Sequence, residues 1–202
     1  MNKKIKIIVA AIFAIVLAGG IFYLWVEYED NNKGMIGLDM KLEEKNGENF
    51  YVSKEAGFSI KQFPGWTAEY HFGKLIIKSP DYVLDEDTAF TPVKGCVFTL
   101  LAERSNYLEP NEGFIKVKNL IDNYDKADES SKANSSLISV SGKKAIKFVA
   151  EDNGIEGKEG KNIFVDMVSH RNLYSFRGWL FGQDRDKCEQ DFGKFLETVS
   201  IK

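Results

Sequence analysis

The feature that most limits what this chain can fold into is an uncharged run near its N-terminus, from Ile7 to Val26. A helix needs about 20 apolar residues to cross the hydrocarbon core of a bilayer, and this run has that length. Three lysines precede it and three acidic residues follow it: Lys3, Lys4, Lys6, Glu27, Glu29 and Asp30. Because positive charge favours the cytoplasmic side, we expect residues 1–28 to form a short cytoplasmic segment and a signal-anchor helix. The rest of this single-pass cell-membrane protein would lie outside, in the periplasm or beyond the cell.

A cleaved signal peptide is the alternative for the same segment, because Ala18, Gly19 and Gly20 are the small residues that a signal peptidase prefers. Cleavage there would leave "IFYLWVEYE" as an exposed apolar N-terminus, so we favour the uncleaved anchor. No cysteine follows the small residues, which excludes a bacterial lipoprotein signal. Both interpretations export the remaining chain.

Residues 29–49 are acidic and rich in Asn and Gly, which predicts a linker between the membrane and a folded domain at residues 50–202. Within this linker, "GLDMKLEE" is alternatively an edge strand or a short helical turn of the domain. The domain has enough aromatic residues for a core, since the whole chain contains 15 Phe and 8 Tyr.

The first half of the domain has the two-residue period of β-strands. "GFSIKQFPGW" is a strand that stops at Pro64, and we expect Phe63 and Trp66 to pack on the sheet where the next strand begins. "WTAEYHF" and "KLIIKSPDY" continue a meander, and "CVFTLLAER" is apolar on both faces, as a central strand would be.

Two helices interrupt the strands. The first has an apolar stripe and Asn111 as its cap; the stripe is Phe114, Val117, Leu120, Ile121 and Tyr124. Hairpins follow, with turns at Ser141-Gly142 and at His170-Arg171-Asn172. The second helix carries the stripe Cys188, Phe192, Phe195 and Val199. The order predicts an α+β fold, an antiparallel sheet flanked by α-helices.

Three stretches of the domain resemble the PsbP/Mog1-like fold family, which includes DcrB-like bacterial envelope proteins. They are "GFSIKQFPGW", "SGKKAIKFVAED" and "NLYSFRGWLFGQDRDKCEQDFGKFLETVSI". Members of the family bind other proteins without performing chemistry. The resemblance therefore implies a binding role and supplies no catalytic residues, and the anchor resembles that of the bacterial envelope members.

The sequence contains no recognisable catalytic or cofactor motif. The net charge of −3 gives no reason to expect nucleic acid as a partner. "NGIEGKEG" has glycines but lacks the Lys-Ser/Thr ending and the helix of a phosphate-binding loop, so we expect no cofactor. A hydrolase would require His71 or His170 to adjoin a Ser or Asp in a cleft.

Two features leave alternatives open. Asp81, Asp85, Glu86 and Asp87 lie in one acidic loop and are weak candidates for calcium ligands, although the loop lacks EF-hand spacing. Cys96 and Cys188 are either a disulfide, as an even pair in an exported domain indicates, or two buried thiols.

These observations predict a non-enzymatic accessory domain, anchored in the membrane, that binds another envelope protein. The alternative is a calcium- or small-ligand-binding envelope protein that uses the acidic loop. An unrecognised hydrolase is the third hypothesis.

Overall fold

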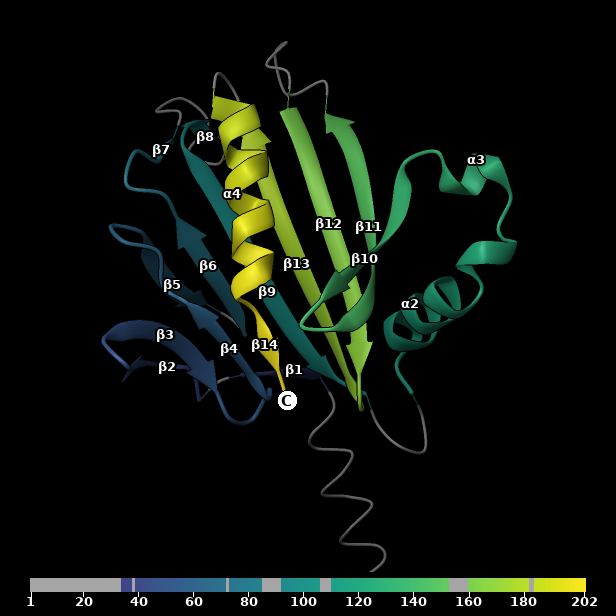
Figure 1. The fold of residues 1–202 in the computed structure, drawn as a ribbon, viewed down its shortest axis with the longest axis horizontal. Helices are drawn as coiled ribbons and strands as arrows, with labels where there is room; N and C mark the ends of the chain where they lie inside the picture. Colours follow the sequence, from purple (N-terminus) through teal and green to yellow (C-terminus); the bar gives the residue numbers. More distant parts are fainter. Residues whose placement is uncertain are drawn as a thin grey trace, which may run out of the picture.

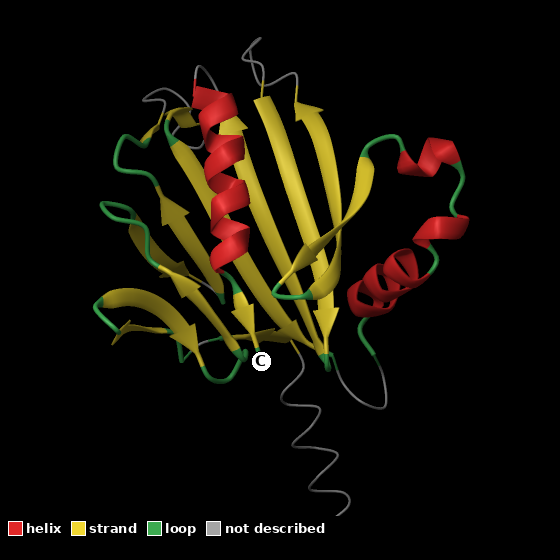
Figure 2. Ribbon diagram, in the orientation of Figure 1, coloured by secondary structure: helices red, strands yellow, loops and turns green. Residues whose placement is uncertain are grey.

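The computed structural model describes residues 34–37, 39–71, 73–84, 92–105, 110–152, 160–181 and 184–202. The predicted membrane span at 7–26 lies outside these residues, and none of the helices within them has both the length and the apolar character needed to cross a bilayer. The described chain is an α+β fold built mainly from antiparallel sheet (Figure 2).

The largest element is an antiparallel sheet in the order β10-β11-β12-β13-β9-β6-β5, with β1 paired to the end of β9 (Figure 1). Its strands are β1 (Gly34–Ile36), β5 (Thr67–His71), β6 (Lys74–Lys78), β9 (Cys96–Arg104), β10 (Ser135–Val140), β11 (Lys143–Asp152), β12 (Gly160–Ser169) and β13 (Asn172–Phe181). The predicted central strand is confirmed, because β9 lies between β13 and β6.

A smaller sheet, in the order β14-β4-β3-β2, completes the main core. Its strands are β2 (Lys41–Lys45), β3 (Glu48–Ser53), β4 (Phe58–Lys61) and β14 (Ser200–Ile201). A separate two-stranded sheet consists of β7 (Val83–Leu84) and β8 (Pro92–Lys94). The helical segments are α2 (Glu112–Asp122), η1 (Tyr124–Lys126), α3 (Glu129–Lys132) and α4 (Arg185–Thr198).

The helices α4 and α2 pack on opposite faces of the large sheet, because alternate residues of a strand point to opposite faces. Tyr174 and Phe176 of β13 belong to the core beneath α4, whereas Leu173 packs with α2. In Figure 1, α4 crosses the near face of the sheet, while α2 lies beside β11 and β12. Both predicted stripes are confirmed in their buried members, such as Val117 in α2 and Phe192 in α4.

The turn around Pro64 places its two aromatic rings as expected. The Phe63 and Trp66 ring centroids are 5.4 Å apart, and Trp66 lies 5.1 Å from Phe98 in the core. Gly65 has a φ of +78°, a conformation that glycine adopts without steric cost. The aromatic pair therefore closes the core at the start of the meander.

The segment predicted as a linker, residues 29–49, instead contributes β1 and β2 to the fold, so the boundary at residue 50 requires correction. The physical reason is a two-residue turn at Asn46-Gly47, both with positive φ, which pairs β2 with β3. Asp39 adds a second link, since its carboxylate accepts hydrogen bonds from the hydroxyl of Ser53 and the backbone N–H groups of Lys54 and Glu55. The edge-strand alternative for "GLDMKLEE" holds for residues 41–44.

Candidate functional site

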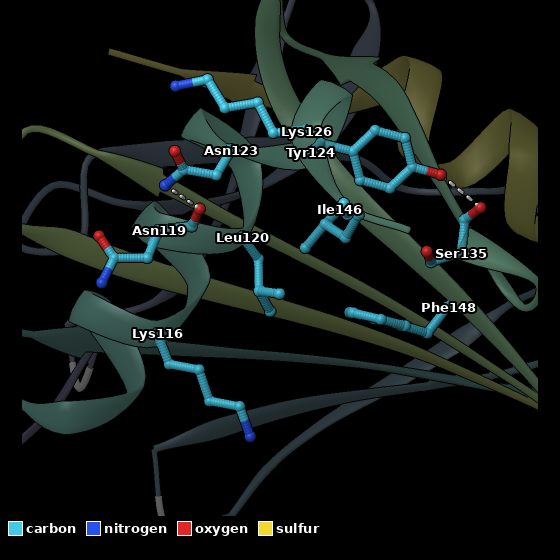
Figure 3. A pocket seen from close by; sticks show the side chains of 10 residues that line it. Lys116, Asn119, Leu120, Asn123, Tyr124, Lys126, Ser135, Ile146 and Phe148 are labelled. Atoms are coloured by element: carbon cyan, nitrogen blue, oxygen red, sulfur yellow. Dashed lines mark hydrogen bonds between the residues drawn. The ribbon is translucent and has the colours of Figure 1, made fainter. Parts of the chain in front are cut away.

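An open hollow of about 400 Å³ lies between α2 and η1 on one side and the β10–β11 hairpin on the other (Figure 3). We call it the α2–β11 pocket. It is lined by Lys116, Asn119, Leu120, Asn123, Tyr124, Lys126, Ala127, Ser135, Ile146 and Phe148. Its size falls in the range of small ligand sites, and its centre is apolar.

The apolar centre of the pocket comes from Leu120, Ile146 and Phe148, whose side chains converge in Figure 3. Val117 and Ile121 bury the inner face of α2 against the sheet. Leu120 belongs to the same predicted stripe, yet its side chain is 38% exposed. The reason is that it lies at the edge of the packed face of α2 and lines the hollow. The helix thus presents more apolar surface than the sheet covers.

Hydrogen bonds hold the polar wall of the pocket in place. The Tyr124 hydroxyl donates to the backbone carbonyl of Ser135 over 2.7 Å, which ties η1 to the start of β10. The Asn123 side-chain amide donates to the carbonyl of Asn119 over 3.1 Å at the end of α2. The Lys132 ammonium lies 5.7 Å from the centre of the Tyr124 ring. Of these contacts, the Tyr124–Ser135 bond spans the gap between the helical segment and the strand, and it therefore helps to set the width of the pocket.

Two lysines, Lys116 and Lys126, stand at opposite ends of the pocket (Figure 3). Neither takes part in an ion pair within the described parts of the chain, whereas the neighbouring Lys118 pairs with Asp122. Among the residues that the structure describes, no acidic one lines the pocket. Its apolar centre therefore has a positively charged rim.

A second hollow, of about 550 Å³, adjoins the first, with Phe148 in the wall of both. It is lined by Asn134, Phe148, Val149, Ala150, Glu151 and Phe164. It lies where β10 ends its pairing with β11: the Val149 N–H donates to the carbonyl of Asn134, and β11 continues beyond that point. The two hollows therefore meet at Phe148, near this edge of the sheet.

The strand beside the pocket, β10, is the terminal strand of the large sheet as described. Its sequence, "SSLISV", contains neither a charged residue nor a proline. Natural edge strands usually carry such residues, which oppose pairing with other chains. Leu137 and Ile138 instead pack into the two cores on either face of the sheet.

The acidic loop of the calcium hypothesis is only partly described. Asp85, Glu86 and Asp87 lie outside the described residues. Asp81 is half-buried, and its carboxylate lies 3.6 Å from the ammonium of Lys187. A hydrogen bond from Ser79 holds the pKa of Asp81 below its usual range. Among the residues with described positions, no three His, Cys, Asp or Glu side chains come together as a metal site would require.

The two histidines lie on the surface, at the end of β5 and at the turn between β12 and β13. His71 ends β5, with its side chain 59% exposed and its Nε2 3.6 Å from the Glu69 carboxylate. His170 is exposed at the tip of the β12–β13 hairpin, with a φ of +56°. Neither histidine is among the described residues that line the two hollows, so no cleft position of the kind that the hydrolase hypothesis requires is seen for them in the described parts of the chain.

Cys96 and Cys188 form a disulfide, with their Cα atoms 5.4 Å apart. The bond joins the first residue of the central strand β9 to the buried face of α4, and both cysteines are fully buried. Of the two alternatives left open by the sequence, the structure contains the disulfide.

Sequence reasoning did not single out the α2–β11 pocket. A signal for it exists in the α2 stripe, where Phe114, Leu120 and Tyr124 widen the apolar face beyond the two residues that the sheet buries. The uncharged run from Ala133 to Gly142 is a second signal.

No family model matches this chain, and no curated protein does so. Among solved structures, a crystal structure from Bacteroides thetaiotaomicron VPI-5482 is similar, with a TM-score of 0.46 and 13% identity. The likeness covers 72% of this chain, which spans 45% of the Bacteroides chain. LpqN, described as involved in cell envelope biogenesis of Mycobacterium tuberculosis, has a TM-score of 0.45 and 12% identity, over 72% of this chain and 83% of its own. At these TM-scores the likenesses carry no argument about family or role, and the resemblance to PsbP/Mog1 proteins is not confirmed.

Proposed function

We propose that this chain is a non-enzymatic accessory protein of the cell envelope, and that its domain docks a segment of another protein in the α2–β11 pocket. The observation that carries the proposal is the apolar hollow itself. Leu120 and Phe148 leave apolar surface open above the buried Ile146, between a helix and a sheet edge. Depressions of this kind, with a few polar groups at the rim, are typical of recognition sites.

Its place outside the cytoplasmic membrane is also a proposal. The uncharged run at residues 7–26, with lysines before it and acidic residues after it, supports an anchor with the domain outside. The Cys96–Cys188 disulfide supports the same side, because disulfides persist in oxidising compartments. Intact cells treated with a membrane-impermeant protease test this point. Digestion of the domain is expected, and complete protection until lysis would contradict it.

The docking role is tested by a photo-crosslinking amino acid placed at one position of α2 at a time. Leu120 is the test position, because it lines the pocket. Ile115 is the matched control, since it lies on the same helix, is 43% exposed and is not among the lining residues. We expect the probe at 120, but not at 115, to crosslink a defined envelope protein in living cells.

The result that would contradict the proposal is equal crosslinking from both positions, or crosslinking of lipid alone at position 120. The first would show an unspecific surface. The second would identify the pocket as a lipid site and remove the protein-docking role.

A further inference from the structure

We propose that the segment docked in the α2–β11 pocket is an extended acidic stretch with one bulky apolar residue as its anchor. This inference rests on the proposed docking function and specifies the chemistry of the partner. It follows from three properties of the pocket: the shape of its apolar centre, the charges at its ends, and the amides along its wall.

The apolar centre of the pocket determines which kind of side chain can serve as the anchor. Ile146 is buried at the base of the hollow, and Leu120 and Phe148 are partly exposed around it, so a side chain entering the hollow would contact mainly Leu120 and Phe148. A hollow of about 400 Å³ takes a side chain as large as Leu, Phe or Trp. Smaller residues would leave the hollow partly filled and would gain little from burial.

The two lysines of the pocket determine which residues are favoured on either side of the anchor. Lys116 and Lys126 extend from opposite ends of the pocket, and their ammonium groups lack ion-pair partners among the described residues (Figure 3). The acidic groups on the same elements are Glu112, one helical turn before Lys116 on α2, Asp122, which pairs with Lys118, and Asp125 of η1. Glu151 lies across Phe148, in the wall of the second hollow. Acidic residues on either side of the anchor would therefore meet the two lysines, and basic residues would be repelled.

The positions of the lysines also favour a peptide over an anionic lipid. A single-chain lipid carries its charge at one end only, so its head group would reach one lysine and leave the other without a partner. A peptide with acids before and after its anchor reaches both. Asn119 and Asn123 also line the pocket; one N–H of the Asn123 amide donates to the Asn119 carbonyl, which leaves its oxygen and second N–H, together with the Asn119 amide, for a peptide backbone.

The experiment is a selection from a random peptide library displayed on phage, against the full-length protein in nanodiscs of phosphatidylcholine. We expect the enriched peptides to contain Leu, Phe or Trp with Asp or Glu on both sides. Fluorescence anisotropy with an enriched peptide then compares variants. Leu120→Gln should weaken binding at least about tenfold, whereas the matched Ile115→Gln should leave it unchanged.

Charge reversal tests the flanks. The double substitution K116E/K126E should weaken binding of the acidic peptide about fivefold or more at low ionic strength and less in high salt. The K116E/K126E protein should instead bind a version of the peptide in which Lys replaces the acidic residues beside the anchor. The control K74E/K202E makes the same change in net charge with two lysines outside the pocket, and should bind like the wild type.

The outcomes separate the inference from the proposed function. Enriched apolar peptides without acids, sensitive to Leu120→Gln but not to K116E/K126E, would overturn the inference and leave docking intact. Peptides insensitive to Leu120→Gln would refute docking in this pocket and the inference with it. Displacement of the peptide by phosphatidylglycerol vesicles, but not by phosphatidylcholine vesicles, would also overturn it, since an anionic lipid would then be the occupant.

Discussion

Reduction of the disulfide between Cys96 and Cys188 is expected to lower the free energy of unfolding of the domain by several kcal/mol. The two cysteines are 92 residues apart in the sequence. In the chain-entropy model, closing a loop of that length removes about 16 cal/mol/K from the unfolded state, or about 4.6 kcal/mol at 25 °C. Measured values for native disulfides are typically about 2–4 kcal/mol, so we take about 3–4 kcal/mol as the expected loss.

The assay is urea unfolding of the full-length protein in detergent micelles, followed by tryptophan fluorescence, with and without reductant. With a slope of about 2 kcal/mol per molar urea, the expected loss lowers the unfolding midpoint by roughly 1.5–2 M. The slope itself should rise on reduction, because an unfolded chain without the crosslink exposes more surface.

A second comparison separates the crosslink from packing. The reduced wild-type protein keeps both sulfur atoms in the core, whereas C96A/C188A loses them as well as the bond. We expect the double variant to be less stable than the reduced wild type by about 1–2 kcal/mol. A midpoint that moves by less than about 0.5 M on complete reduction would refute the loop-closure reasoning.

Two further predictions concern single positions. Gly95→Ala should lower the free energy of unfolding by about 2–4 kcal/mol, because φ is +82° and the added Cβ would lie 2.6 Å from the Cα of Tyr82. Gly142→Ala, with φ at +72° and open space around it, should lower it by only about 1 kcal/mol. Equal losses of stability for the two variants in thermal unfolding would contradict this. The pKa of Asp39 is lowered: burial raises it, but hydrogen bonds from Ser53 and the backbone outweigh that effect. The stability that Asp39 contributes is therefore present above the pKa of the unfolded state and lost as the pH falls through the folded one. Asp39→Asn should be less stable than the wild type at pH 7 and should lose less stability on acidification to pH 3; parallel pH profiles for the two proteins would show that this carboxylate has no such role.

Much of the fold could be predicted because its signals are local. The Asn111 cap was predicted from its position ahead of the apolar stripe, and its side chain accepts the Phe114 N–H over 2.8 Å. The central position of β9 followed from residues that are apolar on both faces. The strand before Asn46-Gly47 was predicted only as the alternative to a linker, although its turn signal is among the strongest, because the surrounding composition is acidic.

The candidate site could not be predicted in the same way. The apolar stripe of α2 predicts that Leu120 is buried, and only the position of the helix relative to β11 shows that it is not. That position depends on the connection through η1 and α3 and on the bond from Tyr124 to Ser135. No local pattern specifies how far a helix lies from the edge of a sheet.

What the amino-acid sequence determined by itself is therefore what short-range physics controls: an uncharged run long enough for a bilayer, the helices and most of the strands with their turns, and an even pair of cysteines. The tertiary structure decided which distant segments meet. It joined Cys96 to Cys188, added residues 34–36 and 41–45 to the domain, and left a hollow beside Phe148. Such features depend on how the elements pack against one another. The space between two elements is determined by the side chains of both and by the neighbouring elements that hold them in position.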